Sequence, residues 1–318
     1  MNILGISAGF HDAAATVLSP DGEILFAGHS ERYSKKKNDA DFCQGLLDEV
    51  LEYSPETVAY YERPWAKQAR QWYAGQGVEW NKLTTKQILT RQLGGQIEPE
   101  RVLSYNHHQS HAAGGFQTSP FERATVVVID AIGEFDTITI WGAEYKNNQA
   151  QYRRLYSQTY PDSIGLFYSA MTKQIGLTPL QDEYKLMKYS EHGNRYNDCT
   201  SILLNSVVHS VRDCTLYDNL HIGLNKSVSD SLLQYSVADV AASTQYVTEQ
   251  LIYSVMQRAK SFNFSNNLVY SGGVALNSIA NNNLSDFFDN IWIMSDPGDS
   301  GSSIGACALA YGHRLTSL

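Results

Sequence analysis

The chain has 318 residues, 43% of them hydrophobic and 18% charged, which is the composition of a globular protein large enough for two lobes. Its formal net charge of −9 excludes nucleic-acid binding through bulk positive charge, so only a local basic patch could contact a polynucleotide. The four cysteines are scattered without a C-x-x-C pair, and no apolar run approaches the roughly 20 residues that span a bilayer. We therefore expect a cytoplasmic protein with reduced thiols and no membrane contact.

Three short strands joined by tight turns are predicted at the start of the chain, over residues 3–7, 13–18 and 23–28. The first turn contains His11 and Asp12, and such an opening is typical of the actin/sugar-kinase ATPase lobe, in which the first hairpin wraps a phosphate. The third strand leads into the charged turn 31–37, ERYSKKK, which is either a solvated loop or an anion-binding rim. A helix is expected next, over residues 41–52.

Residues 60–91 differ from the rest of this acidic chain, because they carry six Lys and Arg residues against two Glu. Four aromatics are interleaved with these cations: Trp65, Trp72, Tyr73 and Trp80. Basic residues alternating with aromatics can pair with phosphates and stack on bases, which makes this segment the best candidate for a nucleic-acid contact. The alternative, which we favour, is a helical hairpin with aromatics in the core and cations on a solvated face.

The central stretch, residues 105–138, carries the clearest chemical pattern. His107 and His111 have the H-x-x-x-H spacing that places two imidazoles on one helix face. The β-branched run 124–129 predicts a strand buried on both faces, with Asp130 at its carboxyl end and a turn containing Gly133 directly after it. Two imidazoles and a carboxylate form a metal-binding set with open positions, although an isolated H-x-x-x-H can also be a solvated helix face.

The second half of the chain again contains strands that end in polar or glycine-rich turns. A capped helix is expected after Ser163, a polar turn at Glu183 and Lys185, a mixed excursion over residues 194–225, and a long helix or helix pair over residues 232–260. Two strands follow, one ending in the turn SGGVALNS and the other in a glycine-rich turn with Asp299. Asp12, Asp130 and Asp299 thus stand at three strand-to-turn edges, which predicts a duplicated two-lobe ATPase fold with one ligand cleft. We expect the lobes at residues 1–145 and 146–318.

Eight motifs in this order resemble the amino-terminal domain of the NodU/CmcH-type O-carbamoyltransferases. They are ILGISAGFHDAAATVL, SERYSKKKND, NHHQSHAAGGF, VVVIDAIGEFDT, SIGLFYSAMT, DEYKLMK, YSGGVALNS and DPGDSGSSIGAC. This domain is related to the enzyme that completes threonylcarbamoyl-adenosine in tRNA. The resemblance implies the α/β, duplicated two-lobe fold of actin and the sugar kinases.

The resemblance also implies a site. It places iron, or another divalent metal, among His107, His111, Asp130 and Asp299. It implies that ATP or carbamoyl-adenylate is bound by the glycine-containing turns, at Gly133, Ser271, Gly272, Gly273, Val274, Asn277 and Gly301. Five further residues would line the cleft as catalytic candidates: His11, Asp12, Glu31, Arg32 and Lys185.

The implied activity is transfer of a carbamoyl group from carbamoyl-adenylate to an acceptor hydroxyl. The family's usual E-G-K-x-M-G block reads EYKLMK here, with Tyr184 and Lys188 at altered positions, so acceptor handling is expected to differ. The family's second, YrdC-like domain, which makes the adenylate from carbamoyl phosphate and ATP, has no counterpart in this sequence. A separate YrdC-like chain is therefore an expected partner, unless the protein is a divergent single-domain version.

Candidate acceptors are a sugar or antibiotic hydroxyl, a nucleotide, and a hydroxymethylated pyrimidine of DNA. Residues 60–91 favour the nucleotide or DNA acceptor. The alternative function is a nucleotide-binding regulatory or assembly subunit without transferase activity, and the retained His and Asp set speaks against it. A sugar kinase is a poorer third reading.

Overall fold

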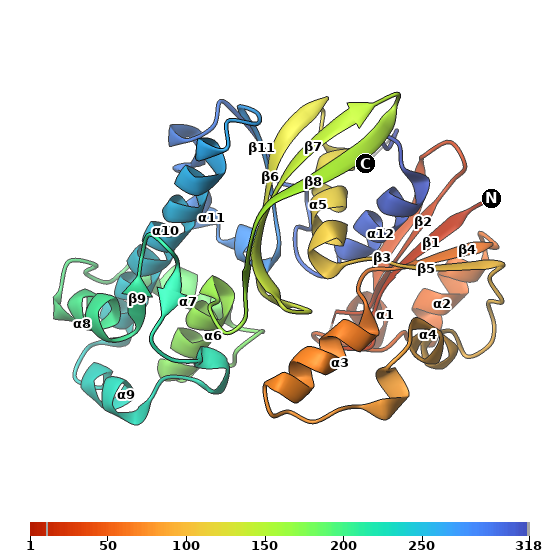
Figure 1. The fold of residues 1–318 in the computed structure, drawn as a ribbon. Helices are drawn as coiled ribbons and strands as arrows, with labels where there is room; N and C mark the ends of the chain where they lie inside the picture. Colours follow the sequence, from red (N-terminus) through yellow and green to blue (C-terminus); the bar gives the residue numbers. More distant parts are fainter. Residues whose placement is uncertain (11, 317–318) are drawn as a thin grey trace.

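The computed structural model describes residues 1–10 and 12–316, which form two five-stranded sheets with helices between and around them (Figure 1). The first sheet has the order β3-β2-β1-β4-β5, and its strands are β1 (Ile3–Ser7), β2 (Ala14–Leu18), β3 (Ile24–His29), β4 (Thr57–Tyr60) and β5 (Arg101–Ser104). The second has the order β8-β7-β6-β11-β12, and its strands are β6 (Arg123–Gly133), β7 (Asp136–Lys146), β8 (Gln149–Thr159), β11 (Asn267–Ser271) and β12 (Asn290–Trp292).

The two sheets share one topology. In each, an antiparallel three-stranded meander is extended by two parallel strands on the free side of its first strand. The run 124–129 lies in β6 and is buried throughout, because helices cover both faces of that strand. The duplicated two-lobe α/β architecture expected from the sequence is therefore confirmed.

The boundary between the sheets differs from the expected one. The strands up to Ser104 belong to the first sheet, and those from Arg123 onward belong to the second. Residue 145 instead lies near the end of β7, which pairs with β8 up to Lys146 and Gln149. A meander is one hydrogen-bonded unit, so β6, β7 and β8 belong to the same lobe. The last helix, α12 (Ser302–Tyr311), crosses back and packs on β1 and β2 of the first lobe.

Helices α5 (His107–Thr118) and α12 lie together between the two sheets (Figure 1). Gly305 makes their close approach possible, since a Cβ there would lie 1.8 Å from the carbonyl oxygen of Ser110. A Cβ on Gly5 of β1 would likewise lie 2.0 Å from the carbonyl oxygen of Ser303. Helix α12 is thus fixed between α5 and the first sheet by backbone contacts that leave no room for side chains.

Residues 60–91 form the expected helical hairpin, with α3 (Pro64–Tyr73) and α4 (Thr85–Leu93), but its faces are the reverse of our expectation. Trp65, Trp72, Tyr73 and Trp80 are between 60% and 72% exposed, whereas Lys67 and Arg70 are buried. Lys67 points inward because its ammonium pairs with the buried carboxylate of Glu62, and Arg70 because it donates to the backbone carbonyl oxygen of Glu134. Lys86 and Arg91 of α4 are exposed, as expected.

The remaining elements are α1 (Ser30–Ser34), α2 (Gln44–Leu51), α6 (Ile164–Gln174), α7 (Glu183–Ser190), α8 (Asp198–Ser206), β9 (Val208–Ser210), β10 (Thr215–Leu216), α9 (Lys226–Leu232), α10 (Val237–Ser261) and α11 (Ser278–Asn281). Among them, α2, α6 and α10 match the expected helices, whereas α1 is a short helix at the start of the expected charged turn. Glu183 and Lys185 lie in the first turn of α7 rather than in a loop. No helix within residues 1–10 and 12–316 is both long and apolar enough to cross a membrane.

Candidate metal and nucleotide site

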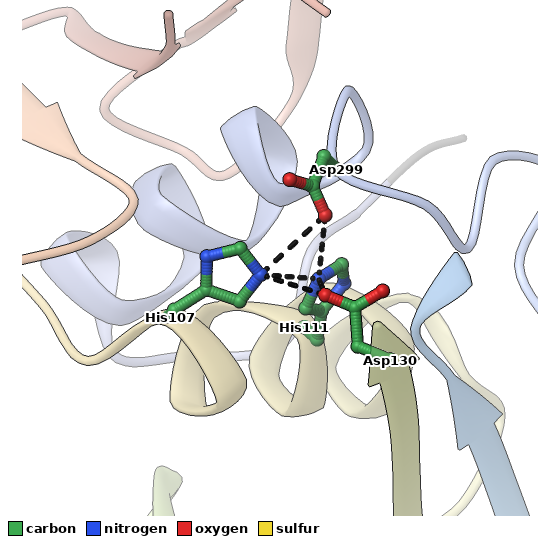
Figure 2. A group of neighbouring side chains, drawn as sticks. All are labelled: His107, His111, Asp130 and Asp299. Carbon is green, nitrogen blue, oxygen red and sulfur yellow. Dashed lines mark hydrogen bonds and ion pairs between the residues drawn. The ribbon is translucent and has the colours of Figure 1, made fainter. Parts of the chain in front are cut away.

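The two histidines of the H-x-x-x-H motif lie in the first two turns of α5 (Figure 2). Asn106 caps this helix, because its side chain accepts a hydrogen bond from the backbone N–H of Gln109. His107 and His111 are almost completely buried, and their Nε2 atoms lie 3.1 Å apart. The sequence spacing therefore places both imidazoles on one face, as expected.

Two aspartates from other parts of the chain complete the cluster. Asp130, in β6, places Oδ2 3.2 Å from Nε2 of His107. Asp299, in the turn before α12, places Oδ1 3.2 Å from Nε2 of His111 and 3.4 Å from that of His107. One ligand atom from each of the four residues lies within 4.8 Å of the other three, and all four residues are buried.

The charges of this cluster suit a divalent cation. Burial disfavours protonated His107, but the charge of Asp299 and hydrogen bonds to Asp130, Asp299 and Glu62 raise the pKa of His107 well above its usual value. Burial and Asp299 oppose ionisation of Asp130, yet its hydrogen bond with His107 and the histidine charges hold its pKa below the usual range. Two imidazoles and two buried carboxylates could hold a divalent metal ion, which would replace the proton of His107.

Neighbouring groups hold the side chains of this cluster in place. The N–H of Gly273 donates to Oδ1 of Asp130 at 3.2 Å, which leaves Oδ2 directed at the histidines. A Cβ on Gly133 would lie 2.4 Å from Cδ2 of His107, so this glycine lets the end of β6 pack on the imidazole. The hydroxyl of Ser302 lies 3.1 Å from Nδ1 of His111.

A cavity of about 390 Å³ opens beside the cluster. Polar groups of both lobes line it, including Asp12, Asn38, Asp130, Gly273 and Asp299, together with apolar groups such as Ile132, Tyr168, Met187, Val274 and Leu276. A volume of this size, apolar on one side and bordered by carboxylates on the other, suits a small molecule with a planar part and a charged end.

The turn after β11 forms one wall of this cavity, through Gly273, Val274 and Asn277. Gly272 has a φ of +92°, and a Cβ there would lie 2.2 Å from the carbonyl oxygen of Ile129. Asn277 caps α11 and pairs through both amide atoms with Gln245. Ser271 is buried beneath the turn, and Gly301 allows a close approach to the carbonyl oxygen of Asp296.

The predicted catalytic residues are less closely grouped. Asp12 lines the cavity, and His11 lies outside the described residues. Glu31 accepts a hydrogen bond from the backbone of Asn38, Arg32 is exposed, and the ammonium of Lys185 pairs with Asp182 at 2.8 Å. These last three do not line the described cavity walls.

Sequence reasoning missed Glu62, whose Oε2 atom lies 3.2 Å from Nδ1 of His107. Its signal was present, because Glu62 follows a short apolar strand at the carboxyl edge where ligand-binding groups gather. We read it only as part of the basic segment. Tyr168 and Thr248 of the cavity wall carried no such signal, since they lie inside long helices.

Comparison with known proteins agrees with this geometry. Residues 60–308 match the family described as "Carbamoyltransferase N-terminus". The chain belongs to this carbamoyltransferase family. An uncharacterized protein of Synechocystis sp. is 33% identical, with 98% of this chain and 57% of that protein aligned. The nodulation protein NolNO of Sinorhizobium fredii is 25% identical, with 94% of this chain and 46% of that protein aligned.

The carbamoyltransferase chain therefore spans about half the length of these relatives. Among solved structures, full-length HypF in a phosphate- and nucleotide-bound form is similar with a TM-score of 0.53, at 14% identity and over 98% of this chain and 55% of that one. Component A of the (R)-2-hydroxyglutaryl-CoA dehydratase of Acidaminococcus fermentans has a TM-score of 0.52, at 14% identity and 98% coverage of both chains. These likenesses confirm the actin/sugar-kinase-like fold.

Proposed function

We propose that this chain transfers a carbamoyl group from carbamoyl-adenylate to an acceptor hydroxyl. The observation that carries the proposal is the joining of the buried His107, His111, Asp130 and Asp299 set to the cavity bordered by Gly273 and Val274. Membership of the carbamoyltransferase family supports the reaction class, and the nucleotide-bound HypF structure supports a nucleotide ligand in this fold.

The residues of the chain suggest a division of roles. Bound iron, or another divalent metal, would polarise the phosphate or carbonyl oxygens of the adenylate. Gly273 and Val274 would seat the nucleotide against the second lobe, with the apolar surface of Ile132 and Met187 around its planar part. In the reaction the acceptor oxygen bonds to the carbamoyl carbon, the bond from that carbon to the phosphate oxygen breaks, and AMP leaves. Asp12 reaches the cavity from the first lobe and would take the proton of the hydroxyl.

The source of the adenylate and the compartment are also proposals. We propose that a YrdC-like domain makes the carbamoyl-adenylate from carbamoyl phosphate and ATP, and the assay below tests this by adding such a domain. Cys43, Cys199, Cys214 and Cys307 are free, which suits the reducing cytoplasm.

The acceptor we propose is a nucleotide or a hydroxymethylated pyrimidine of DNA. The exposed indoles of Trp65, Trp72 and Trp80 support this class, because bases stack on such side chains. Strong duplex binding is not part of the proposal, since Lys67 and Arg70 point inward and Arg63 pairs with Glu134.

The test is an assay with purified protein, ATP and labelled carbamoyl phosphate, run with and without an added YrdC-like domain. Acceptors are nucleotides, hydroxymethylcytosine DNA and an aminoglycoside, and a His107→Ala/His111→Ala variant is the control. Label on an acceptor with the unaltered protein but not with the variant is the expected result. Binding of a nucleotide without transfer to any acceptor under either condition would overturn the proposal.

A further inference from the structure

Behind the metal-binding face of His107 lies a buried ion pair. Glu62, which follows Tyr61 just after the end of β4, is completely buried, and its Oε2 atom lies 3.2 Å from Nδ1 of His107 and 3.1 Å from Nζ of Lys67. Its other oxygen, Oε1, has no hydrogen-bond partner among the described residues. His107 and Lys67 are therefore the groups that hold this carboxylate inside the protein.

Contact with a carboxylate decides which nitrogen of His107 carries a proton. A neutral imidazole has one N–H and one lone pair, and a carboxylate can only accept a hydrogen bond. With Nδ1–H donating to Glu62, the lone pair is on Nε2, the atom that faces Asp130 and Asp299. A carboxylate behind a metal-binding histidine also makes the imidazole a stronger donor to the metal.

Lys67 supplies the counter-charge that lets the carboxylate of Glu62 stay ionised in the protein interior. A buried carboxylate without a counter-charge would be strongly disfavoured. The ammonium of Lys67 is itself buried, 3.8 Å from the centre of the Phe10 ring, so it faces Glu62 and an aromatic surface rather than water. This contact accounts for the inward-pointing cation of α3.

The two histidines are supported differently. His111 has the neutral hydroxyl of Ser302 at Nδ1, whereas His107 has a carboxylate with its own counter-ion. With the charge of Glu62 matched by Lys67, the two negative charges of Asp130 and Asp299 remain for the metal ion.

We infer that Glu62 and Lys67 form a positioning pair that fixes the tautomer of His107 and strengthens it as a metal ligand. The inference rests on the metal site of the proposed function. It concerns residues that touch neither the cavity nor the four ligand atoms themselves.

The test is titration of the metal-free protein with cobalt(II) and iron(II), with affinity from chelator competition and geometry from the visible spectrum of cobalt. The variants are Glu62→Ala, Glu62→Gln, Lys67→Met and Glu62→Gln/Lys67→Met. Asp136→Asn is the matched control, because Asp136 is a buried carboxylate paired with Arg154 rather than with a histidine of the site. Circular dichroism checks that each variant is folded.

Loss of the carboxylate is expected to weaken metal binding about 10–100-fold and to shift the cobalt spectrum. Glu62→Gln keeps an oxygen that can accept from Nδ1–H, so its loss should be smaller, and it carries the test if Glu62→Ala does not fold. Lys67→Met should weaken binding, and the double variant should recover part of that loss. Unchanged affinity and spectrum in folded Glu62 variants would overturn the inference, as would an equal effect of Asp136→Asn. Failure of the unaltered protein to bind either metal would instead overturn the metal site.

Discussion

Gly305 of α12 lies directly against the carbonyl oxygen of Ser110 in α5, at a distance that excludes even a methyl group. Ser110 directly precedes the metal-binding residue His111, and Ser302, one turn before Gly305, contacts the same imidazole. The distance between α5 and α12 therefore determines how far the two histidines of α5 lie from Asp299, which precedes α12.

A Gly305→Ala substitution should therefore weaken metal binding without altering any ligand. The added methyl would force α12 away from α5, and overpacking of this kind costs about 1–3 kcal/mol of stability. Gly114→Ala is the graded control, because its Cβ would lie 3.3 Å from the sulfur of Met294, which can adjust. Thermal unfolding and metal affinity are measured together, and equal behaviour of the two variants would contradict the prediction.

Replacing either metal-binding histidine should remove most of the bound metal. His107→Ala or His111→Ala leaves two carboxylates and one imidazole, and we expect metal affinity to fall more than about 100-fold, beyond the effect expected for the Glu62 variants. Metal content after dialysis against a weak chelator gives the readout. His209→Ala, at an exposed histidine, should keep the full metal content.

The metal-free protein should lose stability as pH rises. Because the folded-state pKa of His107 is raised, its protonation contributes stability that is fully present below the unfolded pKa of about 6.5 and is lost as pH passes through the raised value. Above that value Asp130 and Asp299 lose the positive charge of His107, which contacts both of them. Melting temperatures measured from pH 6 upward should fall for metal-free protein and stay nearly level for metal-loaded protein. Parallel curves for the two forms would contradict this.

Gly272→Ala should disrupt the turn after β11, which we propose to bind the nucleotide. Both Gly272 and Gly176 have positive φ, but only at Gly272 would a Cβ collide with backbone, at the carbonyl oxygen of Ile129, while Gly176 has open space. Gly176→Ala should therefore cost about 1–2 kcal/mol from the backbone strain alone. Gly272→Ala should cost more and abolish ATP binding, which calorimetry would measure. Normal ATP affinity in Gly272→Ala would show that the turn does not hold the nucleotide.

The surface aromatics allow a clean test of nucleic-acid contact. Trp72→Ser removes an exposed side chain and should leave the melting temperature within about 1 °C, given the small effects usual for surface substitutions. If single-stranded DNA stacks on this surface, the same variant should bind it several-fold more weakly in a fluorescence titration. Arg70→Ala is unsuitable for this purpose, because Arg70 is buried and bonds to the carbonyl of Glu134, so it should destabilise the fold. Unaltered DNA binding by Trp72→Ser would remove this surface from consideration.

Local patterns in the sequence were enough to predict the duplicated sheets and the close grouping of His107, His111, Asp130 and Asp299. The spacing of His107 and His111 and the aspartates at strand ends are one-dimensional signals, and the structure brings these residues together. The orientation of α3 was not predictable in this way. Its cations and aromatics alternate in the sequence, and only the buried position of Glu62 and Glu134, set by other strands, decides which set turns inward.

The return of α12 to the first sheet has a consequence for biosynthesis. β1 and β2 leave the ribosome long before α12, which packs on them. At the usual rate of about 5–20 residues per second, the nascent chain exposes that apolar surface for on the order of tens of seconds. Asp299 emerges just before α12, so the metal ion can be bound by all four residues only when translation of this region is nearly complete. The position of α12 would therefore lead chaperones to bind the nascent chain early and the metal ion to bind late.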